Sequence, residues 1–175
     1  VFTSLVAPAD LYTGDFDPPE EGVTRTIQQI AWAPDGETIL FNTVGNFQFG
    51  AVPQSDLWTV TLDGELTELF APFEAGAFAI SAKDELLIAT DSELFRTDLT
   101  RSFNETLLSF VPVVTYSEYV YQPQPVWTAD GEMAYLVLPS SDPLADNPFV
   151  DLWRIPAGGS AELEGTILNS SFTLA

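Results

Sequence analysis

The chain has 175 residues, of which 26 are acidic and 5 are basic, and its formal net charge is −21 at pH 7. With 46% hydrophobic and 18% charged residues it has the composition of a folded domain, and its charge disfavours nucleic acid and anionic membranes as partners. The chain contains no histidine and no cysteine, which excludes Ser-His-Asp and Cys-His nucleophile systems, His or Cys metal sites and disulfides.

Three similar blocks follow one another along the chain. Each has an apolar strand, a tight turn, a second apolar strand and then an acidic residue followed by leucine and an aromatic residue. The turn aspartates Asp35, Asp84 and Asp130 are 49 and 46 residues apart (84 − 35 and 130 − 84), close to the roughly 40 to 50 residues of one four-stranded propeller blade. The blocks are Ile30 to Phe41 with Asp56-Leu57-Trp58, Phe78 to Ile88 with Glu93-Leu94-Phe95, and Pro125 to Tyr135 with Asp151-Leu152-Trp153.

A fourth strand follows the first and second blocks, at Leu66 to Pro72 and at Glu105 to Pro112. The opening segment, Phe2 to Pro8, matches the first of these nearly position for position. In a propeller the outer strand of one blade comes directly before the inner strand of the next blade. We therefore expect residues 1–8 to be the outer strand of a preceding blade.

The turns and strands of the blocks have the chemistry of a β-sheet protein. Pro34-Asp35-Gly36 and Ala129-Asp130-Gly131 are typical of tight hairpin turns, and continuous apolar runs such as Leu86-Leu87-Ile88 are typical of strands covered on both faces. Apolar spacing of the helical kind is not sustained anywhere. The predicted fold class is all-β, a β-propeller of four-stranded antiparallel blades, with the four tryptophans buried between blades.

We expect a single partial propeller domain over residues 1–175, with blades at about residues 27–71, 75–111 and 122–168. Three blades and a leading strand are fewer than the roughly four to eight blades that close a propeller. The segment is therefore expected to be part of a longer chain or of an assembly.

The blocks resemble the repeat of TolB-like β-propellers. The resemblance covers residues 27–168 and rests on the pattern Trp-x-x-Asp-Gly followed by Asp-Leu-Trp, which is clear in the first and third blocks. In the second block Ile80 stands for the tryptophan and Glu85 for the glycine. The resemblance implies a bacterial protein of the periplasm or cell surface.

The long connections are predicted to leave the blades on one face, at residues 9–24, 43–55, 113–124 and 139–149. Insertions gathered on one face of a repeat protein often mark its binding face. Exposed aromatic rings with amide neighbours suit contact with a protein or a carbohydrate. The alternative is that the same rings pack beneath their own loops. The candidate partner-binding residues are Phe47, Phe49, Tyr116, Tyr119 and Tyr121.

Two of the long loops are acidic and suggest calcium, which takes six to eight oxygen ligands. Neither loop has the ligand spacing of an EF-hand. Solvated acidic loops are the alternative, since the composition alone produces such clusters, and no other cofactor is expected. The candidate ligands are Asp15, Asp17, Glu20, Asp142, Asp146 and Asp151.

These observations favour a non-catalytic protein-binding or assembly module with no catalytic residue. The charge favours a basic protein as partner. No apolar run approaches the roughly 18 to 20 residues of a membrane helix, so no membrane insertion is expected. The alternative is the propeller portion of a hydrolase, either a glycosidase that uses carboxylates alone or the non-catalytic propeller of a larger peptidase or esterase.

Overall fold

The computed structural model describes residues 4–7, 11, 24–47, 50–53, 55–112, 122–139 and 149–168. In these residues every regular element longer than a turn is a β-strand. The chain divides into two compact units, Val1–Gly76 and Ala77–Ala175, and each is described by itself.

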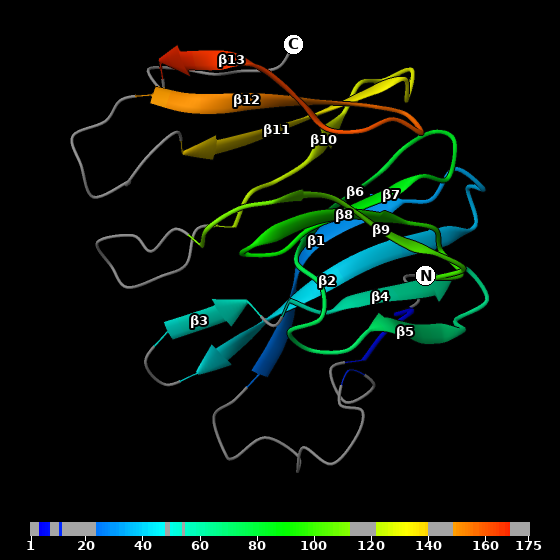
Figure 1. Cartoon of the computed structure of the whole chain (residues 1–175). Helices are drawn as coiled ribbons and strands as arrows, with labels where there is room; N and C mark the ends of the chain where they lie inside the picture. Colours follow the sequence, from blue (N-terminus) through cyan, green and yellow to red (C-terminus); the bar gives the residue numbers. More distant parts are fainter. Residues whose placement is uncertain are drawn as a thin grey trace. The chain divides into compact units, whose positions relative to one another are not determined.

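The first unit contains one antiparallel sheet, drawn in blue to green in Figure 1. Its strands lie in the order β1-β2-β4-β5, and the short strand β3 pairs with the far end of β2. The strands are β1 (Thr24–Trp32), β2 (Thr38–Phe47), β3 (Gly50–Pro53), β4 (Leu57–Thr61) and β5 (Leu66–Phe70).

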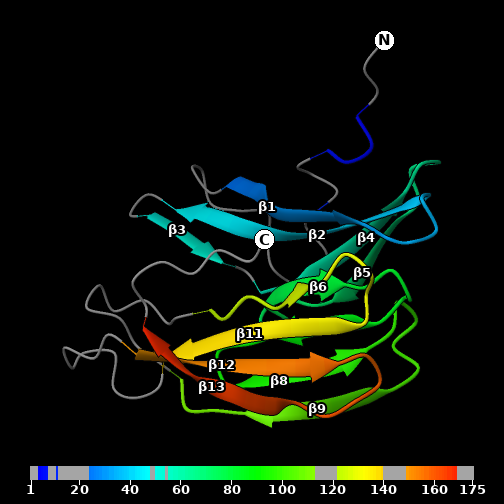
Figure 2. The same ribbon diagram turned by 90° about the horizontal axis from the view of Figure 1, so that it is seen from above.

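The second unit contains two antiparallel sheets of four strands each, which Figures 1 and 2 show lying face to face. Within each sheet the strands follow chain order. These paths, with that of the first unit, confirm the predicted all-β class and have the form of propeller blades. One sheet is β6 (Ala77–Ile80), β7 (Leu86–Ala89), β8 (Glu93–Thr97) and β9 (Asn104–Ser109); the other is β10 (Val126–Trp127), β11 (Met133–Pro139), β12 (Phe149–Pro156) and β13 (Glu162–Leu168).

Apolar side chains hold the two sheets of the second unit together. Leu87 and Leu94 of the β6–β9 sheet pack with Ala134, Leu136 and Ile155 of the β10–β13 sheet, and all five are fully buried. Burial of one leucine or isoleucine side chain contributes about 1.5 to 3 kcal/mol. This shared core is therefore a main source of stability for the unit.

The core of the first unit contains two stacked rings. Phe41 of β2 and Trp58 of β4 are register partners, so both point to the same face of the sheet, and their centroids lie 6.4 Å apart at 10°. Val60 and Leu11 complete the buried cluster. The N-terminal segment at residues 4–7 therefore packs through Leu5 and its neighbour Val6 over this part of the sheet.

The first turn of each block has one residue with positive φ. Gly36 and Gly131 have φ of 70° and 67°, and in the second block Asp84 has φ of 64°. The sequence comparison placed Glu85 at this position, which is wrong by one residue, because the turn closed by Ile80 and Leu86 is one residue shorter than the turn closed by Trp32 and Ile39. Aspartate tolerates the left-handed region better than most residues.

The prediction that all four tryptophans are buried is wrong for Trp32. Trp58 is buried, and Trp127 and Trp153 are partly buried against the core of the second unit. Trp32 is 56% exposed. The described residues of the N-terminal segment pack with Phe41, Trp58 and Val60, and Trp32 is not a member of this cluster.

Alanine substitutions at Gly36 and Gly131 separate the cost of a positive φ from the cost of a close contact. A Cβ at Gly36 would meet nothing within 4 Å, whereas at Gly131 it would lie 3.1 Å from the backbone nitrogen of Ala82 in the neighbouring sheet. We expect G36A to lower the unfolding free energy by about 1 kcal/mol and G131A by at least about 1 kcal/mol more. Urea unfolding measures both, and equal losses would contradict the close contact.

Candidate functional site

In each sheet, the turn from the first strand to the second and the turn from the third strand to the fourth are short and lie at the same end of that sheet. These are the connections at residues 33–37, 62–65, 81–85, 98–103, 128–132 and 157–161. The short turn at residues 90–92 lies at the opposite end of the β6–β9 sheet. The connections at residues 110–125 and 140–148 leave the opposite end. The candidate partner-binding residues Phe49, Tyr116, Tyr119 and Tyr121 lie outside the described residues, as does the side chain of Phe47 at the end of β2. Their role stays a prediction.

One of the candidate calcium ligands is described. The Oδ1 atom of Asp151 in β12 accepts a hydrogen bond from the hydroxyl of Thr166 at 2.7 Å. The described part of the chain contains no group of three or more acidic residues that could hold a metal ion. The calcium site stays a prediction from the sequence, since its other candidates are not described: Asp15, Asp17, Glu20, Asp142 and Asp146.

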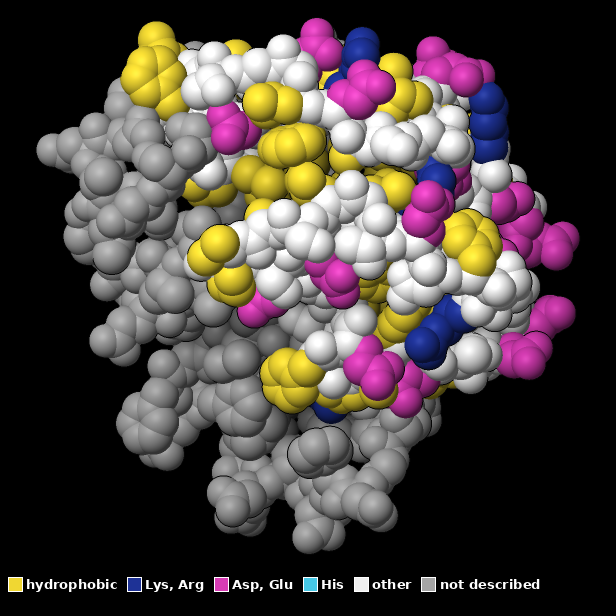
Figure 3. All heavy atoms as spheres, in the orientation of Figure 1, with side chains coloured by type: hydrophobic (Ala, Val, Ile, Leu, Met, Phe, Trp, Pro, Cys, Tyr) yellow, Lys and Arg dark blue, Asp and Glu magenta, His cyan; other side chains and the backbone are white. Residues whose placement is uncertain are grey.

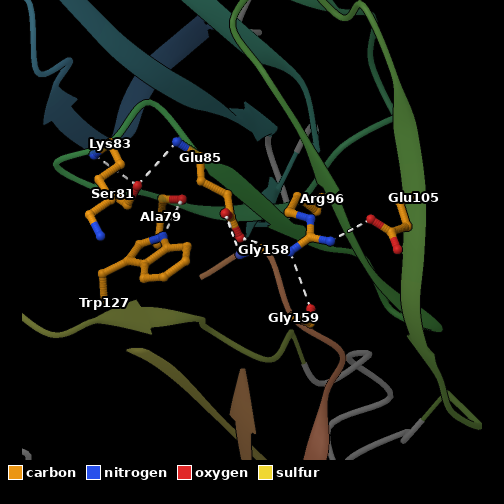
Figure 4. Close-up of polar contacts among 9 residues, drawn as sticks. All are labelled: Ala79, Ser81, Lys83, Glu85, Arg96, Glu105, Trp127, Gly158 and Gly159. Carbon is orange, nitrogen blue, oxygen red and sulfur yellow. Dashed lines mark hydrogen bonds and ion pairs between the residues drawn. The ribbon is translucent and has the colours of Figure 1, made fainter. Parts of the chain in front are cut away.

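A buried ionic cluster that the sequence analysis did not single out lies where the two sheets of the second unit meet, at the end with the short turns (Figure 4). Its centre is Arg96 of β8, whose side chain is nearly buried. The Nη1 atom donates to Glu85 Oε1 and to the carbonyl of Gly159, both at 3.2 Å. The Nη2 atom donates to Glu105 Oε2 at 2.5 Å. We call these residues the Arg96 cluster.

The Arg96 cluster links the β6–β9 sheet to the turn between β12 and β13. Besides the bond from Arg96 to Gly159, the second carboxylate oxygen of Glu85 accepts the N–H of Gly158 at 2.9 Å. A sheet-to-sheet ion pair between Lys83 and Glu132 lies nearby at the surface. A buried cation costs free energy unless it is paired, and here two carboxylates and a carbonyl pair it.

The electrostatics of Arg96 fit a structural role. Burial by itself would lower the pKa of the guanidinium, but hydrogen bonds to Glu105 and Glu85 outweigh it, and the pKa is raised above its ordinary value. Arg96 is therefore a permanent cation whose donors are directed at groups of the same unit. Such a network stabilises a junction between sheets.

The Arg96 cluster lies in the wall of a shallow open depression of about 500 Å³. The depression is at the end with the short turns, opposite the end where the sequence analysis placed the binding loops. Glu85 and Glu105 in this wall both accept hydrogen bonds from Arg96. The lining residues are Lys83, Asp84, Glu85, Arg96, Thr97, Asp98, Phe103, Glu105 and Gly158.

A second buried network explains the Asp-Leu-Trp pattern of the first block. Asp56 is fully buried and accepts three hydrogen bonds, from the N–H and the hydroxyl of Thr43, both at 2.7 Å, and from the indole N–H of Trp58 at 2.8 Å. Arg25 lies 3.6 Å away and balances the charge. The aspartate therefore fixes the tryptophan ring in the core and has a structural role.

The two sheets of the second unit are also joined by an indole hydrogen bond. Trp127 of β10 points toward β6 and donates its Nε1–H to the carbonyl of Ala79 at 3.2 Å (Figure 4). Trp127 also packs against the shared core of the two sheets. Trp127 therefore holds the β10–β13 sheet against β6, the first strand of the β6–β9 sheet.

The two carboxylates that hold Arg96 differ in exposure, which gives a first test. Glu85 is largely buried and makes bonds to both sheets, whereas about half of the Glu105 side chain is exposed. We expect E85A to lower the unfolding free energy by about 2 to 3 kcal/mol, because it leaves a nearly buried cation less compensated, and E105A to lower it by less than about 1 kcal/mol. Urea unfolding of the two variants measures the difference. A larger loss in E105A would contradict this assignment.

Asp98, at the edge of the depression, gives a test by pH. The hydroxyl and N–H of Ser102, with those of Thr100, hold the pKa of this carboxyl well below its usual range. A pKa lower in the folded than in the unfolded state contributes stability that is present above about pH 4 and is lost as the pH falls toward the folded value. In S102A the NMR titration midpoint of Asp98 should rise toward about 3.9, and the loss of stability in acid should be smaller. A wild-type midpoint near about 3.9 would contradict the bonding.

The comparisons with known proteins concern the fold. No protein-family model matches the chain, and no curated protein matches it. No described helix is long and apolar enough to span a membrane. A structural match is the solved structure of a putative TolB from Agrobacterium tumefaciens, with 17% sequence identity and a TM-score of 0.49. It covers 85% of this chain and 52% of that one, so the chain spans about half of its length.

Proposed function

We propose that the chain is a non-catalytic protein-binding or assembly module, which binds a protein partner through the long connections at one end of its sheets. The arrangement of the connections carries the proposal. In the second unit one end of the sheets has short turns alone, whereas the other end has the long connections at residues 110–125 and 140–148 besides the short turn at residues 90–92. At the short-turn end the buried charges of the Arg96 cluster bind one another, which supports a structural role there.

The balance of charge supports a basic partner. Arg25, Lys83, Arg96 and Arg154, which are four of the five basic residues, form ion pairs with carboxylates of the same chain. The chain has 26 acidic residues and 5 basic ones, so the basic residues are too few to pair with most of the acidic residues. Figure 3 shows acidic side chains spread over the visible surface. A field of this sign speeds the encounter with a basic protein at low salt.

The aromatic residues of the long connections supply the contacts in this proposal. Aromatic side chains are enriched in binding hot spots, because they bury a large apolar area against the partner at a small cost in conformational entropy. The TolB-like resemblance of the repeats supports a setting in the bacterial periplasm or at the cell surface. The proposed contact residues are Phe47, Phe49, Tyr116, Tyr119 and Tyr121.

A double substitution tests the proposal. A partner is first identified by photo-crosslinking from position Tyr119 in a bacterial cell-envelope extract and is then purified. We expect the variant with Phe47→Ser and Tyr119→Ser to dissociate from it faster, at a cost of about 2 kcal/mol or more in binding free energy. Salt above about 0.5 M should slow association and change dissociation little.

The matched control is Leu62→Ser, which changes an exposed apolar residue at the short-turn end. It should leave both rate constants unchanged. If the double variant melts at a lower temperature and its folded fraction dissociates at the wild-type rate, the rings pack beneath their loops. That result would refute the proposed contact residues.

A further inference from the structure

Three turns of the chain contain the tripeptide Asp-Gly-Glu. It occurs at residues 35–37, 63–65 and 130–132, and all three aspartates are exposed. In each turn the N–H of the glycine donates to the carbonyl of the residue three positions before it, at 2.9 to 3.1 Å. The three turns therefore share a sequence and a backbone hydrogen bond. A difference between their carboxylates arises from the fold around each turn.

The carboxylates of Asp35 and Asp130 are held by donors of their own turns. In both turns the Oδ1 atom accepts the N–H of the glutamate in the same tripeptide, at 2.8 Å for Asp35 and at 3.1 Å for Asp130. Thr38 donates its hydroxyl to Asp35 Oδ2 at 2.7 Å and its N–H to Oδ1 at 2.8 Å. The hydroxyl of Thr128 donates to Asp130 Oδ1 at 2.6 Å. The threonine hydroxyls, and after them the backbone N–H groups, hold the pKa of both carboxyls below the usual range.

Asp63 lacks this arrangement because its turn is one residue shorter. The N–H of Thr61 donates to the carbonyl of Glu65, whereas the corresponding bonds of the other two turns run from residue 33 to 38 and from residue 128 to 133. The N–H of Glu65, the glutamate of this tripeptide, donates to the hydroxyl oxygen of Thr61 at 3.1 Å and so is not directed at Asp63. In the part of the chain that the structure describes, no donor binds the Asp63 carboxylate.

An aspartate that precedes a glycine can close a ring with its own backbone. The glycine nitrogen attacks Cγ of the protonated aspartate carboxyl, a C–N bond forms, and the carboxyl hydroxyl leaves as water with the proton of the amide. Glycine has no Cβ to obstruct this approach. Water then opens the resulting succinimide at one of its two carbonyl carbons. One of them gives back aspartate, and the other gives isoaspartate, in which the backbone runs through the side-chain carbon.

Hydrogen bonds to the carboxylate oppose this ring closure. The carboxyl must leave its donors, turn toward the glycine nitrogen and take up a proton, and bonds to the ionised form make each of these changes less favourable. Asp35 and Asp130 must give up such bonds, whereas Asp63 has none to lose among the described residues. We infer that Asp63-Gly64 is a site of spontaneous succinimide formation and isoaspartate modification, and that the other two turns are protected by their hydrogen bonds.

The modification changes the connection between β4 and β5. Isoaspartate lengthens the backbone by one carbon atom inside the turn that the N–H of Thr61 and the carbonyl of Glu65 close. In the same turn the N–H of Leu62 donates to the carbonyl of Glu37 at 3.0 Å, which links it to the turn between β1 and β2. A longer backbone changes the spacing of these groups. It also leaves a free α-carboxylate, which is the group that isoaspartyl methyltransferases recognise.

Incubation of the full chain at neutral pH in water enriched in the heavy oxygen isotope tests the inference. Each ring opening adds one heavy oxygen atom at the reacting residue, and peptide mass spectrometry with electron-transfer fragmentation locates this atom and distinguishes isoaspartate from aspartate. We expect Asp63 to take up the label at least about tenfold faster than Asp35 and Asp130, by roughly the effect of one hydrogen bond to a charged group on a rate. In guanidinium chloride the three tripeptides are unfolded and should react at similar rates. A rate at Asp63 no higher than the other two rates in the folded chain would overturn the inference.

Two substitutions test the ring closure and the protection separately. Asp63→Glu lengthens the side chain, so that closure needs a six-membered ring, and label at residue 63 should fall to the background level. Thr38→Val keeps the shape of the side chain and removes the hydroxyl bond to Asp35.

In the Thr38→Val variant, labelling of Asp35 should rise at least about threefold, because one of its bonds to the carboxylate is lost, and labelling of Asp130 should not change. Circular dichroism and thermal unfolding check that both variants are folded. A folded Thr38→Val chain in which Asp35 reacts at the wild-type rate, or label that persists at residue 63 in Asp63→Glu, would refute the inference.

Discussion

The sheets of this chain have apolar side chains on both faces, so each sheet needs a cover on each side. In the second unit this need is met by direct packing, in which Leu87 and Leu94 of one sheet lie against Leu136 and Ile155 of the next. The remaining features of the unit depend on this contact. The indole bond from Trp127 to Ala79, the close approach of Gly131 to Ala82 and the Arg96 cluster all lie along the same junction.

The polar residues at the junction follow from the same packing. A carboxylate or guanidinium beside an apolar core is stable only with partners, because its hydration is lost. Arg96 and Glu85 are paired for this reason, and in the first unit Asp56 is satisfied by Thr43 and Trp58. In the first block the acidic residue of the motif, Asp56, thus has a structural role.

The first unit shows what happens where the cover is incomplete. Its N-terminal segment packs through Leu5 and Leu11 on the stacked rings of Phe41 and Trp58, whereas Ile30 and Trp32 of β1 are exposed. The exposure of a side chain in this repeat therefore depends on what packs on its sheet, and the residue type alone does not determine it.

Much of the fold could be predicted from the sequence, because strand alternation and turn chemistry are local properties. The apolar runs Ile39-Leu40-Phe41 and Leu86-Leu87-Ile88, the Asp-Gly turns and the period of the blocks predicted antiparallel sheets, and the structure contains them. The local pattern also had limits. The turn at Asp84 was misaligned by one residue, since residue type alone does not show which position has the positive φ.

Only the tertiary structure decided which side chains are covered and which charges meet. Trp32 and Trp127 have the same local sequence pattern, yet one is exposed and the other is held by Ala79, because coverage depends on the neighbouring sheet and not on the strand itself. Likewise, Arg96 and Gly159 are 63 residues apart in the chain and come together only at the junction. The sequence by itself determined the strands, the turns and the sign of the surface charge, which depend on neighbours in the chain and on composition. Packing across sheets determined the contacts at the junction and the different exposure of Trp32 and Trp127, which depend on residues distant in sequence.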